Sequence, residues 1–148
     1  MSLETEVMSA MKTAMKNKDK EALRGLRAIK SAILLEKTSG SQQELNEAGE
    51  IKLLQKLIKQ RKESIGIYEE QGRDDLAKTE KEEIEVIQQF LPEQLSEDEL
   101  KSILKKIIDE TGASSMADMG KVMGRATGEV KGRADGKTIS AIVKQLLA

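Results

Sequence analysis

Apolar residues recur at intervals of three and four along most of this 148-residue chain. No segment shows the sustained apolar–polar alternation that is typical of a β-strand. The sequence therefore predicts an all-α protein. Helices are expected from Leu3 to Ala14, after Asp19, near 44–71, near 75–90, after Ser96, after Ser115 and near 136–147.

The best domain boundary is the run Leu91-Pro92-Glu93-Gln94. Proline disfavours helical geometry at the residue before it and has no backbone N–H to donate. We expect an N-terminal helical domain of about four helices over residues 1–92 and a small three-helix domain over residues 95–148. A loop over Thr38-Ser39-Gly40-Ser41 interrupts the first domain.

The composition excludes several kinds of chemistry. The chain has no cysteine, hence no thiolate nucleophile, and no histidine, the usual base at neutral pH and the commonest metal ligand. We expect no independent catalysis, no catalytic residue, no cofactor and no metal. The N-terminus lacks a basic segment followed by an apolar run, and no stretch approaches about 18 consecutive apolar residues. A cytoplasmic protein without a membrane partner is expected.

Charge is unevenly distributed along the chain. The net charge is −1, but residues 74–99 carry ten acids against two lysines, and residues 112–148 carry six bases against three acids. Such asymmetry bears on partners rather than on fold. The aromatic residues are Tyr68 and Phe90, too few for the base-stacking platform that single-strand binders use.

Glycine occupies every fourth position from 120 to 136, and four of these five glycines precede a lysine or arginine. A four-residue spacing keeps side chains on roughly one face of a helix. That face would be bare backbone edged by cations, able to approach phosphates closely. The glycines are Gly120, Gly124, Gly128, Gly132 and Gly136.

A structural explanation of these glycines competes with the functional one. Each glycine inside a helix costs about 0.5–1 kcal/mol relative to alanine. The simplest arrangement is a helix to about Ala126, a polar hinge over 127–135 and a final helix. Gly120 and Gly124 would let neighbouring helices pack closely, and Gly132 and Gly136 would be turn or cap residues. The basic residues of the hinge would then be either solvated or in contact with phosphate.

Other motifs favour structural roles. The run from Gly132 to Thr138 resembles a phosphate-binding loop, but three residues separate its glycines where the Walker A motif has four, and no strand precedes it. The acidic run 80–85 is interpreted as a solvated helix face. We interpret Met116, Met119 and Met123 as core, and Arg24, Arg27 and Lys30 as a salt-bridged surface rather than an RNA contact.

Several segments together resemble a known family. The run Met119-Gly-Lys-Val-Met-Gly124, the run Gly132-Arg-Ala-Asp-Gly-Lys137 and the apolar end are similar to the YqeY family and to the C-terminal tail domain of GatB, the B subunit of the tRNA-dependent amidotransferase. The N-terminal half agrees through three further runs. These are Leu23-Arg-Gly-Leu-Arg-Ala-Ile-Lys30, Ile58-Lys-Gln-Arg-Lys-Glu-Ser64 and Gln89-Phe-Leu-Pro-Glu-Gln-Leu95.

The resemblance implies a two-part helical fold and a tail that holds the body of tRNA while other domains do the chemistry. It also implies that any activity would be that of a carbon–nitrogen ligase with glutamine as amido-N-donor, although the catalytic cradle of that enzyme is missing. The residues carried over by position are Lys121, Arg125, Lys131, Arg133 and Lys137 as candidate phosphate contacts, with Gly132 and Gly136 permitting close backbone approach.

Three functions follow as hypotheses. The first is an accessory module that binds tRNA through its backbone, since duplex RNA is recognised largely by shape and by phosphate or 2′-OH contacts. The second is a non-catalytic component of a glutamine-dependent carbon–nitrogen ligase, with an amidotransferase or an aminoacyl-tRNA synthetase as partner. The third is a protein-interaction module that uses the acidic residues 74–99.

Overall fold

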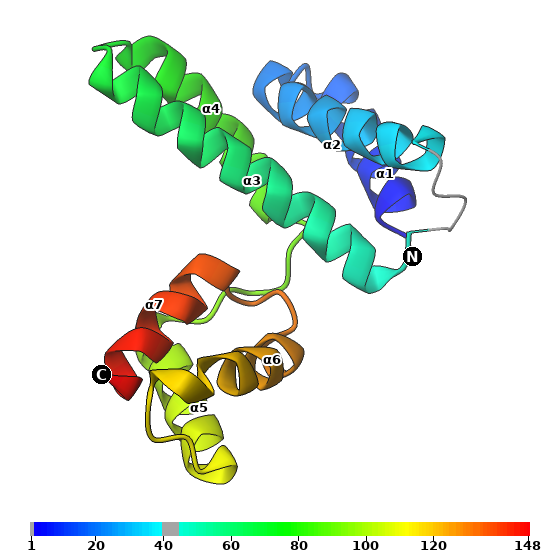
Figure 1. Ribbon diagram of the computed structural model, residues 1–148. Helices are drawn as coiled ribbons and strands as arrows, with labels where there is room; N and C mark the ends of the chain where they lie inside the picture. The colour runs from blue at the N-terminus through cyan, green and yellow to red at the C-terminus, as the bar shows by residue number, and fades with distance from the viewer. Residues whose placement is uncertain (1, 40–44) are drawn as a thin grey trace. The chain divides into compact units, whose positions relative to one another are not determined.

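The computed structural model describes residues 2–39 and 45–148, and within these ranges it contains helices and no strand (Figure 1). The predicted all-α fold class is confirmed. The helices are α1 (Leu3–Lys16), α2 (Lys20–Thr38), α3 (Glu47–Glu70), α4 (Asp74–Gln88), α5 (Glu97–Thr111), α6 (Met119–Val130) and α7 (Gly136–Leu147), with a 3₁₀ turn at Met116–Asp118. Gly40 and Ser41 of the expected loop lie outside the described residues.

Short polar side chains cap the start of five helices, α1, α2, α3, α5 and α7. Asp19 accepts a hydrogen bond from the Ala22 N–H at 3.1 Å, and Asn46 accepts one from the Gly49 N–H at 2.8 Å. Such caps satisfy N–H groups that have no partner within the helix. The cap at Asn46 starts α3 three residues later than the expected position near 44.

The chain divides into two compact units, Met1–Leu91 and Pro92–Ala148. In the first unit, α1 packs on α2, α3 packs on α4, and α2 packs on α4. The apolar stripes of these helices meet in one core. Its buried residues are Leu3, Val7, Ala14, Leu23, Leu26, Ile29, Ile33, Leu54, Ile58, Ile84 and Ile87.

An ion-pair network joins three helices of the first unit. Arg24 of α2 pairs with Glu83 of α4 at 3.2 Å, and Arg61 of α3 pairs with the same carboxylate at 2.9 Å. Arg24 also pairs with Glu82 at 2.8 Å, as expected for a salt-bridged surface. The interpretation of 80–85 as a solvated face was wrong for Glu82 and Glu83, because both are half-buried against arginines of neighbouring helices.

The second unit is a three-helix domain with its own core. Its buried residues are Leu100, Leu104, Ile107, Val122, Ala126, Val130, Ile139, Ile142, Val143 and Leu147. Met119 and Met123 pack against this core, whereas the side chain of Met116 is exposed, so the core prediction was wrong for Met116. No described helix in either unit has the length and apolar character needed to cross a bilayer.

Candidate nucleic-acid interface

Helix α6 is built from three four-residue units, Met-Gly-Lys-Val, Met-Gly-Arg-Ala and Thr-Gly-Glu-Val. The last residue of each unit, Val122, Ala126 and Val130, is buried in the core. Each glycine lies two positions earlier, which is about 200° around a helix of 3.6 residues per turn. The glycines therefore lie on the face opposite the core.

The helix continues past Ala126, where we expected a polar hinge to begin. Val130 is only 1% exposed and extends the buried stripe by one more turn. A single valine among polar residues gives little periodic signal, which explains the error. The connection to α7 is correspondingly shorter and covers residues 131–135.

The glycines of α6 face open space. Gly120, Gly124 and Gly128 are exposed, and a Cβ added at any of them would meet no other atom of the described chain within 4 Å, apart from neighbouring residues and the helix's own backbone. The expectation that Gly120 and Gly124 allow close helix packing was therefore wrong. Three glycines in a helix cost about 2 kcal/mol relative to alanine, and no packing within the described chain compensates for that loss.

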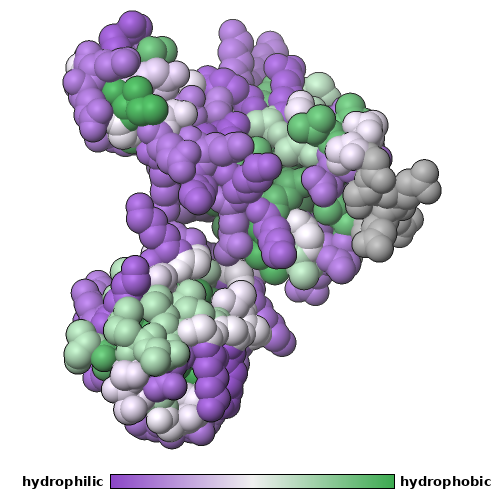
Figure 2. All heavy atoms as spheres, viewed as in Figure 1, coloured by the Kyte–Doolittle hydropathy of each residue, from purple (hydrophilic) through white to green (hydrophobic). Residues whose placement is uncertain are grey.

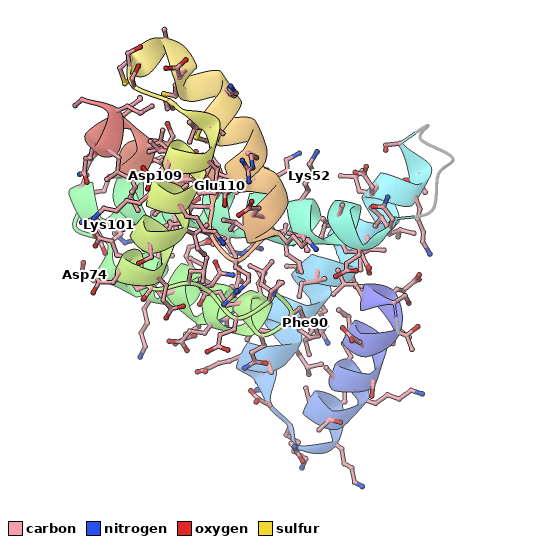
Figure 3. All side chains as sticks on the ribbon, turned by 90° about the horizontal axis from the view of Figure 1, so that it is seen from below. Lys52, Asp74, Phe90, Lys101, Asp109 and Glu110 are labelled. Carbon is pink, nitrogen blue, oxygen red and sulfur yellow. The ribbon has the colours of Figure 1, made fainter. Side chains whose placement is uncertain are left out.

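One edge of this glycine row carries Lys121 and Arg125, and both side chains have partners. The Lys121 ammonium donates to the Thr111 carbonyl at 3.3 Å. Arg125 forms an ion pair with Glu110 of α5 (labelled in Figure 3) and a weaker one with Glu129 at 3.4 Å. A phosphate at Arg125 would have to compete with these two carboxylates.

The turn after α6 holds the other candidate residues. Lys131 ends the helix in the left-handed conformation with φ of 48°, and Gly132 follows with φ of 80°. The left-handed conformation costs a residue with a side chain about 1–2 kcal/mol, so glycine suits position 132. The backbone N–H of Lys131 donates to the Thr127 carbonyl at 3.3 Å, whereas its exposed side chain has no hydrogen bond or ion pair to any residue of the described chain.

Lys137 lies in the first turn of α7, directly after Gly136. A cation is unfavourable there, because the N-terminus of a helix carries a partial positive charge. Its side chain is exposed and, like that of Lys131, has no ion-pair partner among the residues that the structure describes. Neither side chain is therefore held by an ion pair within the described chain, although Lys131 lies at the C-terminal end of α6, where the helix dipole favours a cation.

Arg133 is bound within the second unit. Its Nε donates to the Glu93 carbonyl at 3.1 Å, and its own carbonyl accepts from the Leu95 N–H at 2.8 Å. Gly132 is bound too, because its carbonyl accepts from the side-chain amide of Gln94 at 3.0 Å. The sequence did not indicate these contacts, since they join segments about 40 residues apart.

Acidic groups lie beside the cations. Asp118 precedes α6 and accepts hydrogen bonds from the N–H groups of Ser114 and Ser115 at 3.0 and 3.3 Å. These bonds, together with the positive charge of Lys121, hold the pKa of the Asp118 carboxyl below its ordinary value. Asp135 caps α7 by accepting from the Thr138 N–H at 2.7 Å. Among the candidate phosphate contacts, Lys131 and Lys137 are therefore the cations whose side chains have no partner in the described chain.

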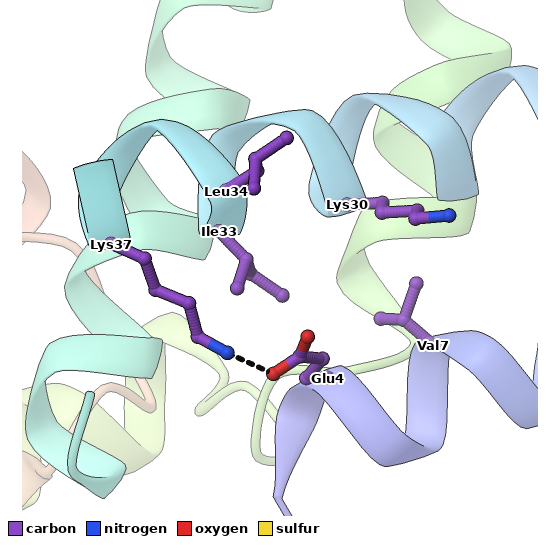
Figure 4. Close-up of a pocket in the computed structure, with 6 residues that line it drawn as sticks. All are labelled: Glu4, Val7, Lys30, Ile33, Leu34 and Lys37. Atoms are coloured by element: carbon purple, nitrogen blue, oxygen red, sulfur yellow. Dashed lines mark hydrogen bonds and ion pairs between the residues drawn. The ribbon is translucent and has the colours of Figure 1, made fainter. Parts of the chain in front are cut away.

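A separate hollow of about 60 Å³ lies between α1 and α2 of the first unit (Figure 4). Its lining combines apolar side chains with Lys30 and with the ion pair between Lys37 and Glu4. Apolar surface is visible in Figure 2 on the side of the first unit where α1 and α2 lie. The hollow includes none of the residues expected to contact phosphate.

Comparison with known proteins identifies the family. The profile of the family described as Yqey-like protein matches residues 4–147. Altered inheritance of mitochondria protein 41, mitochondrial, from Pyrenophora tritici-repentis is 30% identical over 142 residues, covering 93% of this chain and 76% of that protein. A glutamyl-tRNA(Gln) amidotransferase subunit from Thermococcus gammatolerans is 38% identical over 55 residues, covering 34% of this chain but only 9% of that protein. The chain belongs to the YqeY family, and the second match supports its relation to the amidotransferase.

Proposed function

We propose that this YqeY-family protein is an accessory tRNA-binding module that contacts the RNA backbone and does no chemistry of its own. The observation that carries the proposal is the exposed glycine row of α6, which has open space at every Cβ position. Bare helix backbone lets a nucleic-acid strand approach more closely than a face covered by side chains.

The surrounding charges fit such a ligand. Lys131 and Lys137 follow the glycine row in the chain and are the uncommitted cations of the turn region. A contact between a lysine and a phosphate positions the nucleic acid but carries no information about its base sequence. Lys121, Arg125 and Arg133 have internal partners, so we assign them secondary contacts that form when a phosphate displaces or shares those partners.

The choice of tRNA rests on one relative. The Thermococcus protein is named for an amidotransferase of glutamyl-tRNA(Gln), and this chain corresponds to only a small part of it. We therefore carry over tRNA as the ligand class and not the amidation activity. The cytoplasm is the proposed location; the fungal relative is named as mitochondrial, and fractionation of cells would decide between the two.

The deciding experiment measures tRNA affinity at several salt concentrations. Affinity should fall with salt with a log–log slope of about −0.7 to −0.9 per neutralised phosphate. The double variant Lys131→Gln/Lys137→Gln should weaken binding and flatten the slope by about 1.4–1.8. Arg133 is left unchanged because its replacement would also disturb the contact with Glu93.

The matched control is Lys105→Gln/Lys106→Gln, which removes the same charge from exposed positions on α5 of the same unit. This control should bind tRNA as the parent does. If the two double variants behave alike, the turn is not the RNA site and the proposal is wrong.

A second candidate function is that of a non-catalytic component of a glutamine-dependent carbon–nitrogen ligase. The similarity to the amidotransferase favours it. The chain would then deliver tRNA to a separate catalyst. Addition of the purified protein to a reconstituted amidation reaction should raise the rate of amidation in this case. An unchanged rate would exclude the ligase component and leave the tRNA-binding module as the proposed function.

A further inference from the structure

The segment that joins the two units is hydrogen-bonded to the cationic turn of the second unit. The side-chain nitrogen of Gln94 donates to the Pro92 carbonyl at 2.8 Å and to the Gly132 carbonyl at 3.0 Å. On either side of it, Arg133 donates to the Glu93 carbonyl, and the Leu95 N–H donates to the Arg133 carbonyl. We call this set of contacts the clasp; its residues are Pro92, Glu93, Gln94, Leu95, Gly132 and Arg133.

The clasp leaves a very short junction between the units. Leu91 packs against the core of the first unit, whereas Glu93 is already bonded to Arg133 in the second. Pro92 lies between them, and its ring restricts φ to about −65°. When the clasp is closed, residues 93–95 are held against the turn of the second unit, and when it opens, they are released.

The same contacts support the turn that carries the candidate binding residues. Gly132 has a positive φ, and the residue before it, Lys131, is held in the left-handed conformation. The carbonyls of Gly132 and Arg133, the two that follow Lys131, accept hydrogen bonds from the segment 94–95. Opening of the clasp therefore removes part of what holds Lys131 in its conformation.

We propose that occupation of the cationic turn by RNA phosphate and closure of the clasp are coupled, with Gln94 as the positioning residue. This inference rests on the proposed function. If RNA binds the turn more tightly when the clasp is closed, then bound RNA must in turn favour closure of the clasp, because linkage between two equilibria is reciprocal. Bound RNA then holds residues 93–95 against the turn of the second unit.

The test uses the full chain with purified tRNA and follows hydrogen exchange at the Leu95 N–H, which reports opening of the clasp. Added tRNA should slow this exchange in the parent. Gln94→Ala should speed the exchange without ligand and weaken tRNA binding about fivefold or more, the usual range for coupled sites. The salt slope should not change, because no phosphate contact has been removed.

The matched control is Gln145→Ala, which truncates an exposed glutamine on α7 of the same unit and should alter neither quantity. Unchanged exchange at the buried Val143 N–H confirms that the Gln94 variant keeps its core. The inference is overturned if tRNA binds the parent but leaves Leu95 exchange unchanged, or if Gln94→Ala binds with the affinity of the parent.

Failure of the inference can be told apart from failure of the proposed function. If Lys131→Gln/Lys137→Gln weakens binding and Gln94→Ala does not, the turn binds RNA and only the coupling is wrong. If the parent retains no tRNA at any salt concentration, both are wrong.

Discussion

Gly25 of α2 lies directly against Val86 of α4, so that a Cβ built on Gly25 would come within 2.7 Å of both Cβ and Cγ1 of the valine. Real side chains do not approach so closely. Because Gly25 has no side chain, the backbones of α2 and α4 can approach each other closely at this point. It occurs beside the ion pair of Arg24 with Glu83, so the two contacts together fix how α2 lies on α4.

Gly25→Ala should destabilise the protein although alanine is the better helix former. Overpacking of a close contact costs about 1–3 kcal/mol, which exceeds the gain in helix propensity. Urea unfolding would measure the loss. The double variant Gly25→Ala/Val86→Ala should recover only part of it, because the second substitution removes Cγ1 but leaves the valine Cβ position, which also lies within 2.7 Å of the added methyl. Equal stability of Gly25→Ala and the parent would show that α2 and α4 can separate at little cost.

Glu83→Ala should destabilise the first unit by about 2–3 kcal/mol, since it leaves Arg61 half-buried without its carboxylate. The side chains of Arg61 and Glu83 are only 15% and 13% exposed, which limits compensation by water. The control is Glu69→Ala, which breaks the exposed pair with Lys81 and should cost less than about 1 kcal/mol. Thermal unfolding of both variants checks this difference, and equal losses would contradict it.

Most of the fold could be predicted because its signals are local. Asp19, Ser96, Gly112 and Asp135 mark helix ends through contacts with residues a few positions away. The network of Arg24, Arg61 and Glu83 could not be predicted in the same way. It joins three helices, and nothing in the local pattern tells which arginine meets which carboxylate.

The candidate site shows the same limit. Spacing alone singled out the glycine row and the cations, and the structure places the glycines of α6 on one exposed face. Spacing could not show that Glu110 neutralises Arg125, or that Arg133 is bonded to Glu93. Those partners come from elements distant in sequence, so the environment of each cation had to come from the fold.

Glu80→Gln should raise the melting temperature at pH 7. Burial, and secondarily the charge of Glu83, raises the pKa of the Glu80 carboxyl above its ordinary value of 4.5. The folded protein then holds a proton that the unfolded chain has lost, so the free energy of unfolding falls as pH rises through this interval. Glutamine avoids that loss. The advantage should disappear below about pH 4, where the carboxyl is protonated in both states; a pH-independent advantage would contradict this explanation.

Gly124→Ala separates a structural from a functional role of the glycine row. An added methyl meets open space, so alanine should stabilise the second unit by about 0.5–1 kcal/mol through helix propensity alone. If RNA lies along this face, the same methyl holds the backbone away, and we expect affinity for tRNA to fall by about 1 kcal/mol, roughly fivefold. Gly66→Ala on α3 is the control, because Gly66 also faces open space but lies in the first unit. It should stabilise the protein and leave tRNA binding unchanged. If the Gly124→Ala protein is more stable and binds tRNA as well as the parent, the glycine row is not part of the RNA-binding surface. Its glycines would then serve neither packing nor RNA binding.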